Sequence, residues 1–312
     1  MIEKAGRATA DVPETIMYFC YGPQSLYDQT IYSILSLLHV TAGSTLNARI
    51  TGSCDRPDAF AALPVETIEV DQQQLDAWLG GSDYIHRRKT CAIIDALQRF
   101  GGKVTFLDSD TYWIGSPATI FRQIGPDRAC FHMKEGYLRS TGTPFDNALT
   151  RQLKSHQYRI GSDAPVEVDR MTIMWNTGVV GVDVRNLNLM NDALALSDKI
   201  WNDADPNGAY GKKIHHAEQF AMGYAFRNCR LSEADEAIYH YWPSTAKAIF
   251  GQVLPDLVKA GLDDQSPESL RRLYAARFRD VGLGAAKERL KMSVRRRCIS
   301  LGIPVNGVRR SA

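Results

Sequence analysis

Two aspartates stand directly behind an apolar run of the sequence. Val104 to Leu107 is typical of a buried strand, and Asp108-Ser109-Asp110 follows it. Side chains alternate with a period of two in an extended chain, so both aspartates point to one side. Open α/β sheets bind ligands at the carboxyl ends of their strands. Two carboxylates that converge there repel each other unless a cation lies between them. Hard oxygen ligands suit Mg²⁺ or Mn²⁺, which commonly add phosphate oxygens to their shell. The pattern therefore predicts a divalent cation that holds a nucleotide diphosphate.

Three further segments carry polar groups that could complete such a site. Asn176-Thr177-Gly178 leads into an apolar strand, and Glu218-Gln219 lies near the start of a helical stretch over 215–226. His240 stands among aromatic residues, with Lys247 seven positions later. A lone histidine in such surroundings is also typical of a buried structural residue, so spacing alone leaves its role open.

Alternating strand and helix patterns supply the elements that must position these residues. Strand character recurs at short intervals with Gly or Pro breaks, and apolar residues at three- and four-residue spacing mark helices between them. This alternation predicts a layered α/β sheet. We expect strands over 15–21, 48–54, 65–70, 104–107 and 172–184, helices over 26–38, 88–100, 191–201 and 215–226, and loops over 136–165.

Charge is unevenly distributed along the 312 residues. The 37 Lys and Arg against 35 Asp and Glu give a net charge of +2. From Gln265 onward there are twelve basic and three acidic residues, so this tail carries 12 − 3 = +9 and the rest 2 − 9 = −7. A mildly acidic body argues against nucleic acid as the partner. The basic tail, with Leu, Ile, Val and Phe among its cations, could instead contact an anionic membrane surface or pack as a solvated helix.

Cysteine spacing and hydropathy point to a cytoplasmic protein. The six cysteines are at least 34 positions apart, so they form no zinc-binding motif and are expected to be reduced core thiols. No apolar run approaches the ~20 residues that span a bilayer. We expect a cytoplasmic location, with peripheral contact at the inner membrane face through the basic tail.

Taken in order, these segments resemble the nucleotide-sugar glycosyltransferases of the GT-A fold, most closely the retaining galactosyl- and glucosyltransferases of the family-eight type. The resemblance covers residues 16–250 and none of the basic tail. The charge count and the helical pattern after Pro255 predict a basic helical extension over 255–312. The resemblance implies an α/β fold with a Rossmann-like mixed sheet flanked by helices, as a catalytic domain over 1–254. It also implies metal-dependent transfer of a hexose from a nucleoside-diphosphate sugar, with UDP as the expected nucleotide, in polysaccharide biosynthesis.

The resemblance also implies roles for individual residues. Asp108, Asp110 and His240 are the implied ligands of Mn²⁺ or Mg²⁺, and Lys247 would meet a donor phosphate. Glu218-Gln219 stands where the family has an Asp-Gln pair beside the donor sugar, and is the implied catalytic pair. The implied donor contacts are Cys20, Tyr21, Lys89 with Arg88 as second choice, Ser109, Asn176 and Thr177.

Several mechanisms and functions stay open on the sequence. In the retaining reaction that the resemblance implies, the departing phosphate helps to deprotonate the acceptor and Gln219 lies near the anomeric carbon. An inverting enzyme needs a general base, for which Glu218 or Asp169 could serve. A sugar-nucleotide nucleotidyltransferase and a non-catalytic membrane-surface binding protein are the alternatives. A glycan or lipid-linked acceptor would face a region that contains Tyr137, Arg139, Arg151 and His156.

Overall fold

The computed structural model describes residues 12–138, 144–169, 171–204, 214–242 and 244–279, together with positions 293–294, 297–298 and 301. The expected position Arg139 and most of the basic tail lie outside the described residues.

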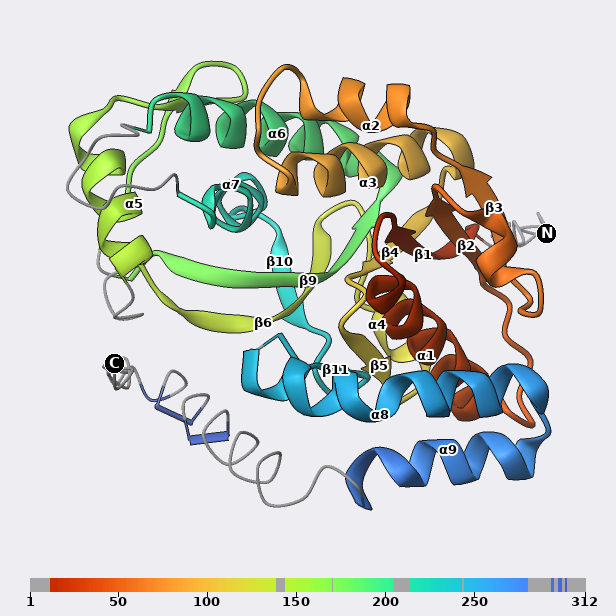
Figure 1. Ribbon diagram of the computed structural model, residues 1–312. Coiled ribbons are helices and arrows are strands. Elements are labelled where there is room, and N and C mark those ends of the chain that lie inside the picture. Colours follow the sequence, from red (N-terminus) through yellow and green to blue (C-terminus); the bar gives the residue numbers. More distant parts are fainter. Residues whose placement is uncertain are drawn as a thin grey trace, which may run out of the picture.

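A seven-stranded sheet forms the centre of the molecule (Figure 1). Its order is β10-β6-β9-β4-β1-β2-β3, and within it β9 runs antiparallel to both of its neighbours while the other pairs are parallel. The predicted α/β fold class, a mixed sheet flanked by helices, is confirmed. The strands are β1 (Glu14–Cys20), β2 (Arg49–Cys54), β3 (Glu66–Glu69), β4 (Lys103–Leu107), β6 (Arg128–Tyr137), β9 (Ile173–Asp183) and β10 (Arg230–Glu233).

Helices cover both faces of this sheet, which is why its central strands are apolar on both sides (Figure 1). One apolar cluster joins the sheet to α3 (His86–Phe100), α6 (Leu187–Asn202) and α7 (Ala217–Ala225). A second cluster, on the opposite face, joins it to α1 (Gln24–Thr41), α8 (Ser244–Asp263) and α9 (Pro267–Arg279). The shorter elements are η1 (Pro57–Phe60), α2 (Gln72–Leu79), α4 (Pro117–Phe121), α5 (Pro144–Ser155), β7 (Arg159–Ile160), β8 (Ala164–Pro165) and η2 (Val184–Asn186).

A small two-stranded ribbon continues from the carboxyl end of β4. It pairs β5 (Thr111–Trp113) with β11 (Ile238–His240) in antiparallel register, with His240 opposite Thr111. The backbone N–H of Tyr241 donates to the carbonyl oxygen of Asp110 at 3.0 Å. This pairing brings a residue from late in the chain next to the acidic turn.

The segment 136–165 was expected to form loops, and this expectation is wrong for much of it. The strand β6 continues to Tyr137, and the helix α5 and the strands β7 and β8 lie within the segment. In α5, Leu149 and Leu153 are buried one helical turn apart, against a mostly polar remainder. The Gly, Thr and Ser residues ahead of the helix are typical of loops, and the apolar repeat in α5 is too short to outweigh them in a prediction from sequence.

The boundary expected between residues 254 and 255 lies inside α8, which runs through Pro255. Leu254 and Val258, on either side of it, belong to the same apolar cluster as α1. Leu270 and Leu273 of α9 belong to that cluster too. The helices α8 and α9 therefore pack on the body. In the described part of the chain, no helix is both long and apolar enough to cross a membrane.

Replacing Leu254 with Ala tests this packing. Leu254 is 2% exposed, so Leu254→Ala should lower the free energy of unfolding by about 2–4 kcal/mol, as expected for a cavity in a core. The exposed neighbour Asp256 is the control, and Asp256→Ala should change stability by less than about 0.5 kcal/mol. Urea unfolding followed by circular dichroism measures both. Equal, small effects would mean that α8 is not part of the core.

Candidate active site

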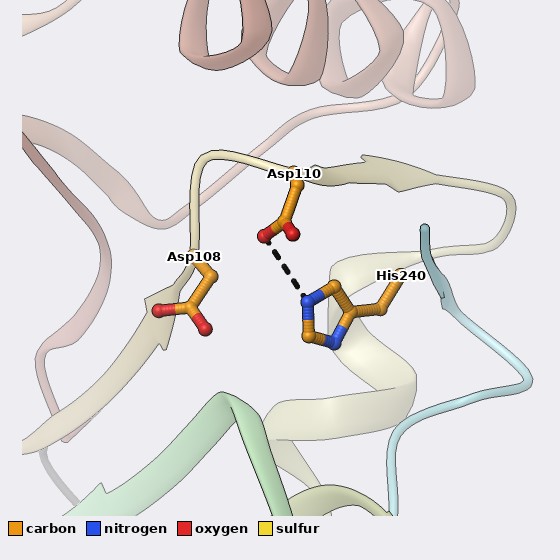
Figure 2. Close-up of side chains that lie close together, drawn as sticks. All are labelled: Asp108, Asp110 and His240. Atoms are coloured by element: carbon orange, nitrogen blue, oxygen red, sulfur yellow. Dashed lines mark hydrogen bonds and ion pairs between the residues drawn. The ribbon is translucent and has the colours of Figure 1, made fainter. Parts of the chain in front are cut away.

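The two aspartates lie at the carboxyl end of β4, at the edge of the sheet. Asp110 is buried and the side chain of Asp108 is 29% exposed. Figure 2 shows that both carboxylates and the imidazole of His240 point toward a common space. One ligand atom from each of the three side chains lies within 4.8 Å of the others. The residues predicted as a metal site therefore come together from the turn that follows β4 and from β11.

Asp110 is paired with two basic side chains. Its Oδ1 lies 3.1 Å from Nε2 of His240, and its Oδ2 lies 2.6 Å from Nζ of Lys247. Burial alone would raise the pKa of the Asp110 carboxyl, but His240 and Lys247 outweigh burial and hold that pKa well below its ordinary value. Asp110 is therefore a carboxylate at neutral pH, the form that binds cations. Lys247 differs from the other two residues because its side chain is 45% exposed.

His240 is held from its other side by Asn176. The Nδ1 atom of His240 lies 2.9 Å from Oδ1 of Asn176, and both side chains are buried. The rings of His132 and Trp242 pack against the imidazole, with centroid distances of 5.1 and 4.9 Å. The imidazole is thus fixed between β9 and the acidic turn.

Lys89, in the first turn of α3, forms the centre of a second ionic cluster. Its Nζ lies 3.2 Å from Oε1 of Glu218 and 3.5 Å from the Asp108 carboxylate, and it donates to Thr177. Burial disfavours its charge, yet Asp108 and Glu218 outweigh burial and raise the pKa of Lys89. Arg88, the second choice, instead donates to the Leu75 carbonyl and faces Asp76 and the Tyr21 ring.

Glu218 is buried in the first turn of α7. Its Oε2 accepts a hydrogen bond from the Thr177 hydroxyl at 3.2 Å. Burial raises the pKa of Glu218 above its ordinary value, and the charge of Lys89 opposes that rise. The backbone N–H of Glu218 has no partner within the helix, and it donates to the Tyr84 hydroxyl at 2.8 Å. Tyr84 was not identified from the sequence, because its role depends on contacts more than a hundred residues away.

Gln219 lies beside a carboxylate that the sequence analysis did not identify. Its Nε2 donates to Oε2 of Glu135 at 3.4 Å, and Glu135 lies on β6. The buried Oε1 of Gln219 has no hydrogen-bond partner among the described residues. Glu135 had no local signal, since neither its spacing nor its neighbours in the sequence mark it.

The remaining residues expected at the donor lie around the ends of β1 and β4. Cys20 is buried at the end of β1, where burial raises the pKa of its thiol to about 12. The ring of Tyr21 lies 4.9 Å from that of Phe19 and faces Arg88. The Ser109 hydroxyl donates to Oε1 of Gln29 at 3.1 Å.

Asp169, the other candidate base, lies in the segment before β9 and is not part of the group formed by Asp108, Asp110 and His240. It is exposed, and its Oδ1 accepts hydrogen bonds from the Met171 backbone and the Thr172 hydroxyl. It borders an open cavity of about 740 Å³ between β6, β9 and α7, with Lys134 and Arg227 among the other lining residues. Of the residues expected to face the acceptor, Tyr137 ends β6, Arg151 lies in α5 and His156 follows α5.

The chemistry of the donor set fits a divalent metal ion. Two carboxylates and an imidazole nitrogen converge, and Asp108 and Asp110 are oxygen ligands of the kind that Mg²⁺ and Mn²⁺ prefer. A cation at this position would relieve the repulsion between the two carboxylates. Asp108, Asp110 and His240 can therefore bind a divalent metal.

No protein-family model and no curated protein sequence matches the chain. Among solved structures, the chain is similar to the galactosyltransferase LgtC in complex with donor and acceptor sugar analogues. Identity there is 10% and the TM-score 0.49, over 78% of this chain and 95% of that one. It is also similar to mouse xyloside xylosyltransferase 1, with 11% identity and a TM-score of 0.44, over 70% of this chain and 82% of that one.

A third similar structure is the bifunctional glycosyltransferase WbbM, with 13% identity and a TM-score of 0.41, over 72% of this chain and 39% of that one. These three structures are of glycosyltransferases. At these identities and TM-scores the likeness carries no argument about the activity or the substrate of this chain.

Removing the Lys89 charge should destabilise the protein in a pH-dependent manner. Lys89→Met leaves Asp108 and Glu218 without their shared cation, which should cost about 3–5 kcal/mol near pH 7. The raised pKa of Glu218 means that the folded state binds this proton more tightly than the unfolded chain does. Stability therefore falls as pH rises from the ordinary carboxyl pKa through the raised one. Without Lys89 the pKa of Glu218 rises further, so the pH range over which stability falls extends to higher pH. The loss of stability in Lys89→Met should therefore be smaller at pH 5 than at pH 8.

Urea unfolding with a chelator present measures the loss at both pH values. Lys103 provides a matched control, because its Nζ pairs with Glu14 at 3.2 Å, and the two side chains are 19% and 29% exposed. Lys103→Met should show a smaller loss and little dependence over this pH range. An equal loss for Lys89→Met at pH 5 and pH 8 would contradict the role given to the Glu218 carboxylate.

Proposed function

We propose that this protein is a metal-dependent glycosyltransferase that moves a hexose from a nucleoside-diphosphate sugar, UDP being the expected nucleotide, to a glycan or lipid-linked acceptor with retention. The observation that carries the proposal is the convergence of Asp108, Asp110 and His240 at the carboxyl end of β4, with Lys247 in contact. Cleavage of a sugar–phosphate bond leaves a negatively charged diphosphate, which positive charge at this edge of the sheet would stabilise.

The diphosphate side of the reaction falls to four residues. Asp108, Asp110 and His240 would hold Mn²⁺ or Mg²⁺. A bound metal ion supplies Lewis-acid stabilisation of the negative charge that develops on the leaving phosphate. Lys247 would add a cation, since its side chain is 45% exposed and its ammonium contacts Asp110 at the same edge. Cys20, Tyr21 and Ser109, at the ends of β1 and β4, would contact the nucleoside.

The sugar side falls to Glu218, Gln219 and the residues that hold them. Retention is supported by the surroundings of the two candidate bases. The Glu218 carboxylate is buried and engaged by Lys89 and Thr177, which leaves it poorly placed to take a proton from an acceptor hydroxyl. Asp169 is exposed and bonded within its own loop. The buried Oε1 of Gln219 is then the polar group offered to the anomeric centre.

The enzyme is tested by scoring nucleoside diphosphate release from a panel of nucleotide sugars with and without Mn²⁺. Asp110→Asn should lower metal-dependent turnover by more than about 100-fold, since it removes a ligand charge from the site. The exposed Asp127, next to β6, supplies the control: Asp127→Asn should keep full turnover. Circular dichroism shows whether both variants keep the fold.

Three results would overturn parts of the proposal. Normal turnover by Asp110→Asn would remove the metal site from the mechanism. Pyrophosphate release from a nucleoside triphosphate would favour a nucleotidyltransferase. An inverted anomeric configuration of the first-formed product, read by NMR, would exclude retention and return Glu218 and Asp169 to consideration as bases.

We also propose a cytoplasmic location with peripheral docking on the inner membrane face, in polysaccharide biosynthesis. The basic tail supports this, since it carries a charge of +9 among apolar residues. In vesicle sedimentation, binding should rise with the fraction of anionic lipid and fall with salt, and replacing Arg295, Arg296 and Arg297 with Gln should weaken it. Binding that does not depend on the fraction of anionic lipid would contradict the docking proposal. It would not bear on the transferase proposal.

A further inference from the structure

We propose that Asn176-Thr177-Gly178 forms a cradle for the imidazole of His240, and that Asn176 is a positioning residue that makes Nε2 the ligand atom. The proposal deepens the proposed function, because it concerns the same metal site. It gives Asn176 a task different from the donor contact that the resemblance implies, since the amide oxygen of Asn176 faces His240.

The direction of the Asn176 amide is fixed by a backbone group. The N–H of Gly178 lies 3.0 Å from Oδ1 of Asn176. A backbone N–H can only donate, so the amide atom at that position must be the oxygen and not the nitrogen.

That oxygen in turn fixes the proton on the ring. Oδ1 of Asn176 is also 2.9 Å from Nδ1 of His240, and an amide oxygen can only accept. Nδ1 must therefore carry hydrogen, whatever the state of the other nitrogen. Nε2, which faces Asp110 at 3.1 Å, is left as the ring atom that can offer a lone pair to a metal ion.

Gly178 is needed because the ring lies directly against the β9 backbone. A Cβ at this position would come within 2.1 Å of Cε1 and 2.2 Å of Nδ1 of His240. Any side chain at 178 would displace the imidazole from the acidic pair. The carbonyl oxygen of Gly178 also accepts the backbone N–H of Asp108 at 2.8 Å, so one residue positions two of the three predicted ligands.

The remaining faces of the ring are closed by aromatic groups. His132 packs edge-on and Trp242 at a tilt, and His240 is 4% exposed. A flipped ring would place a carbon atom against Oδ1 of Asn176 and lose the hydrogen bond. The cradle thus selects one ring orientation before any metal ion arrives.

The first test is NMR of protein with ¹⁵N-labelled histidine, in metal-free and Mg²⁺-loaded states. Seven histidines are present, so His240→Gln identifies the His240 signals. We expect a hydrogen-bonded Nδ1–H in both states. A ring proton found only on Nε2 would overturn the proposal, and this result does not depend on whether the protein is a transferase.

The second test is Mn²⁺ affinity, measured by electron paramagnetic resonance without nucleotide. Asn176→Leu keeps the side-chain volume but removes the acceptor, and should weaken Mn²⁺ binding by about 10- to 100-fold. Asn176→Asp restores an acceptor oxygen and should recover most of the affinity. If Asn176→Leu is unfolded by circular dichroism, Asn176→Asp and the wild-type NMR result carry the test.

The matched control is a second buried asparagine. Asn186 donates from Nδ2 to the carbonyl of Gly125 at 3.0 Å and is 4% exposed, away from the site. Asn186→Leu should leave Mn²⁺ affinity unchanged. Wild-type affinity in Asn176→Leu, or an equal loss in Asn186→Leu, would overturn the positioning role. Absence of Mn²⁺ binding by the wild-type protein would instead overturn the proposed function.

Discussion

Repulsion between carboxylates at the end of a buried strand is the constraint around which this edge of the molecule is arranged. Asp108 and Asp110 converge where the sheet ends, Lys89 joins Asp108 to Glu218, and burial disfavours the charge of Asp110 and of Glu218. The groups that pair with these carboxylates come from three separate elements: Lys89 from α3, His240 from β11 and Lys247 from α8. Such a cluster is stable only when each of these elements is in place, so the site and the fold depend on each other.

The topology of the sheet meets this requirement through two antiparallel insertions. Strand β9 enters between β4 and β6 and carries Asn176, Thr177 and Gly178 to the end of β4. The β5–β11 ribbon then folds His240 back onto the acidic turn. Both insertions use backbone hydrogen bonds, which fix position more firmly than side-chain contacts alone. The predicted ligands are thus placed by strand pairing.

The two lysines at the site differ in what they can do. The side chain of Lys89 is 12% exposed, and its ammonium is surrounded by Asp108, Thr177 and Glu218. These contacts give Lys89 a structural role, because it holds the two carboxylates in place. Any effect of Lys89 on a donor would act through these residues. Lys247 reaches the site from α8 with nearly half of its side chain in solvent, so in the proposed function it would exchange Asp110 for a phosphate oxygen. The buried Lys89 therefore supports the site, whereas the half-exposed Lys247 is accessible to a ligand.

The sequence by itself determined the strand that ends in Asp108-Ser109-Asp110, the α/β alternation and the resemblance that gathered Asn176, Glu218 and His240 into one proposed site. These signals are local, because apolar periodicity and the spacing of two aspartates involve only a few neighbouring residues. Only the tertiary structure decided that Asn176 faces His240 and that Lys89, not Arg88, pairs with Glu218. It also showed that Tyr84 contacts Glu218 and that Glu135 contacts Gln219. It also placed α5 in a segment expected to be loop and continued α8 across Pro255. Contacts of this kind join residues many tens of positions apart, and strand order and register, which no single segment encodes, select them.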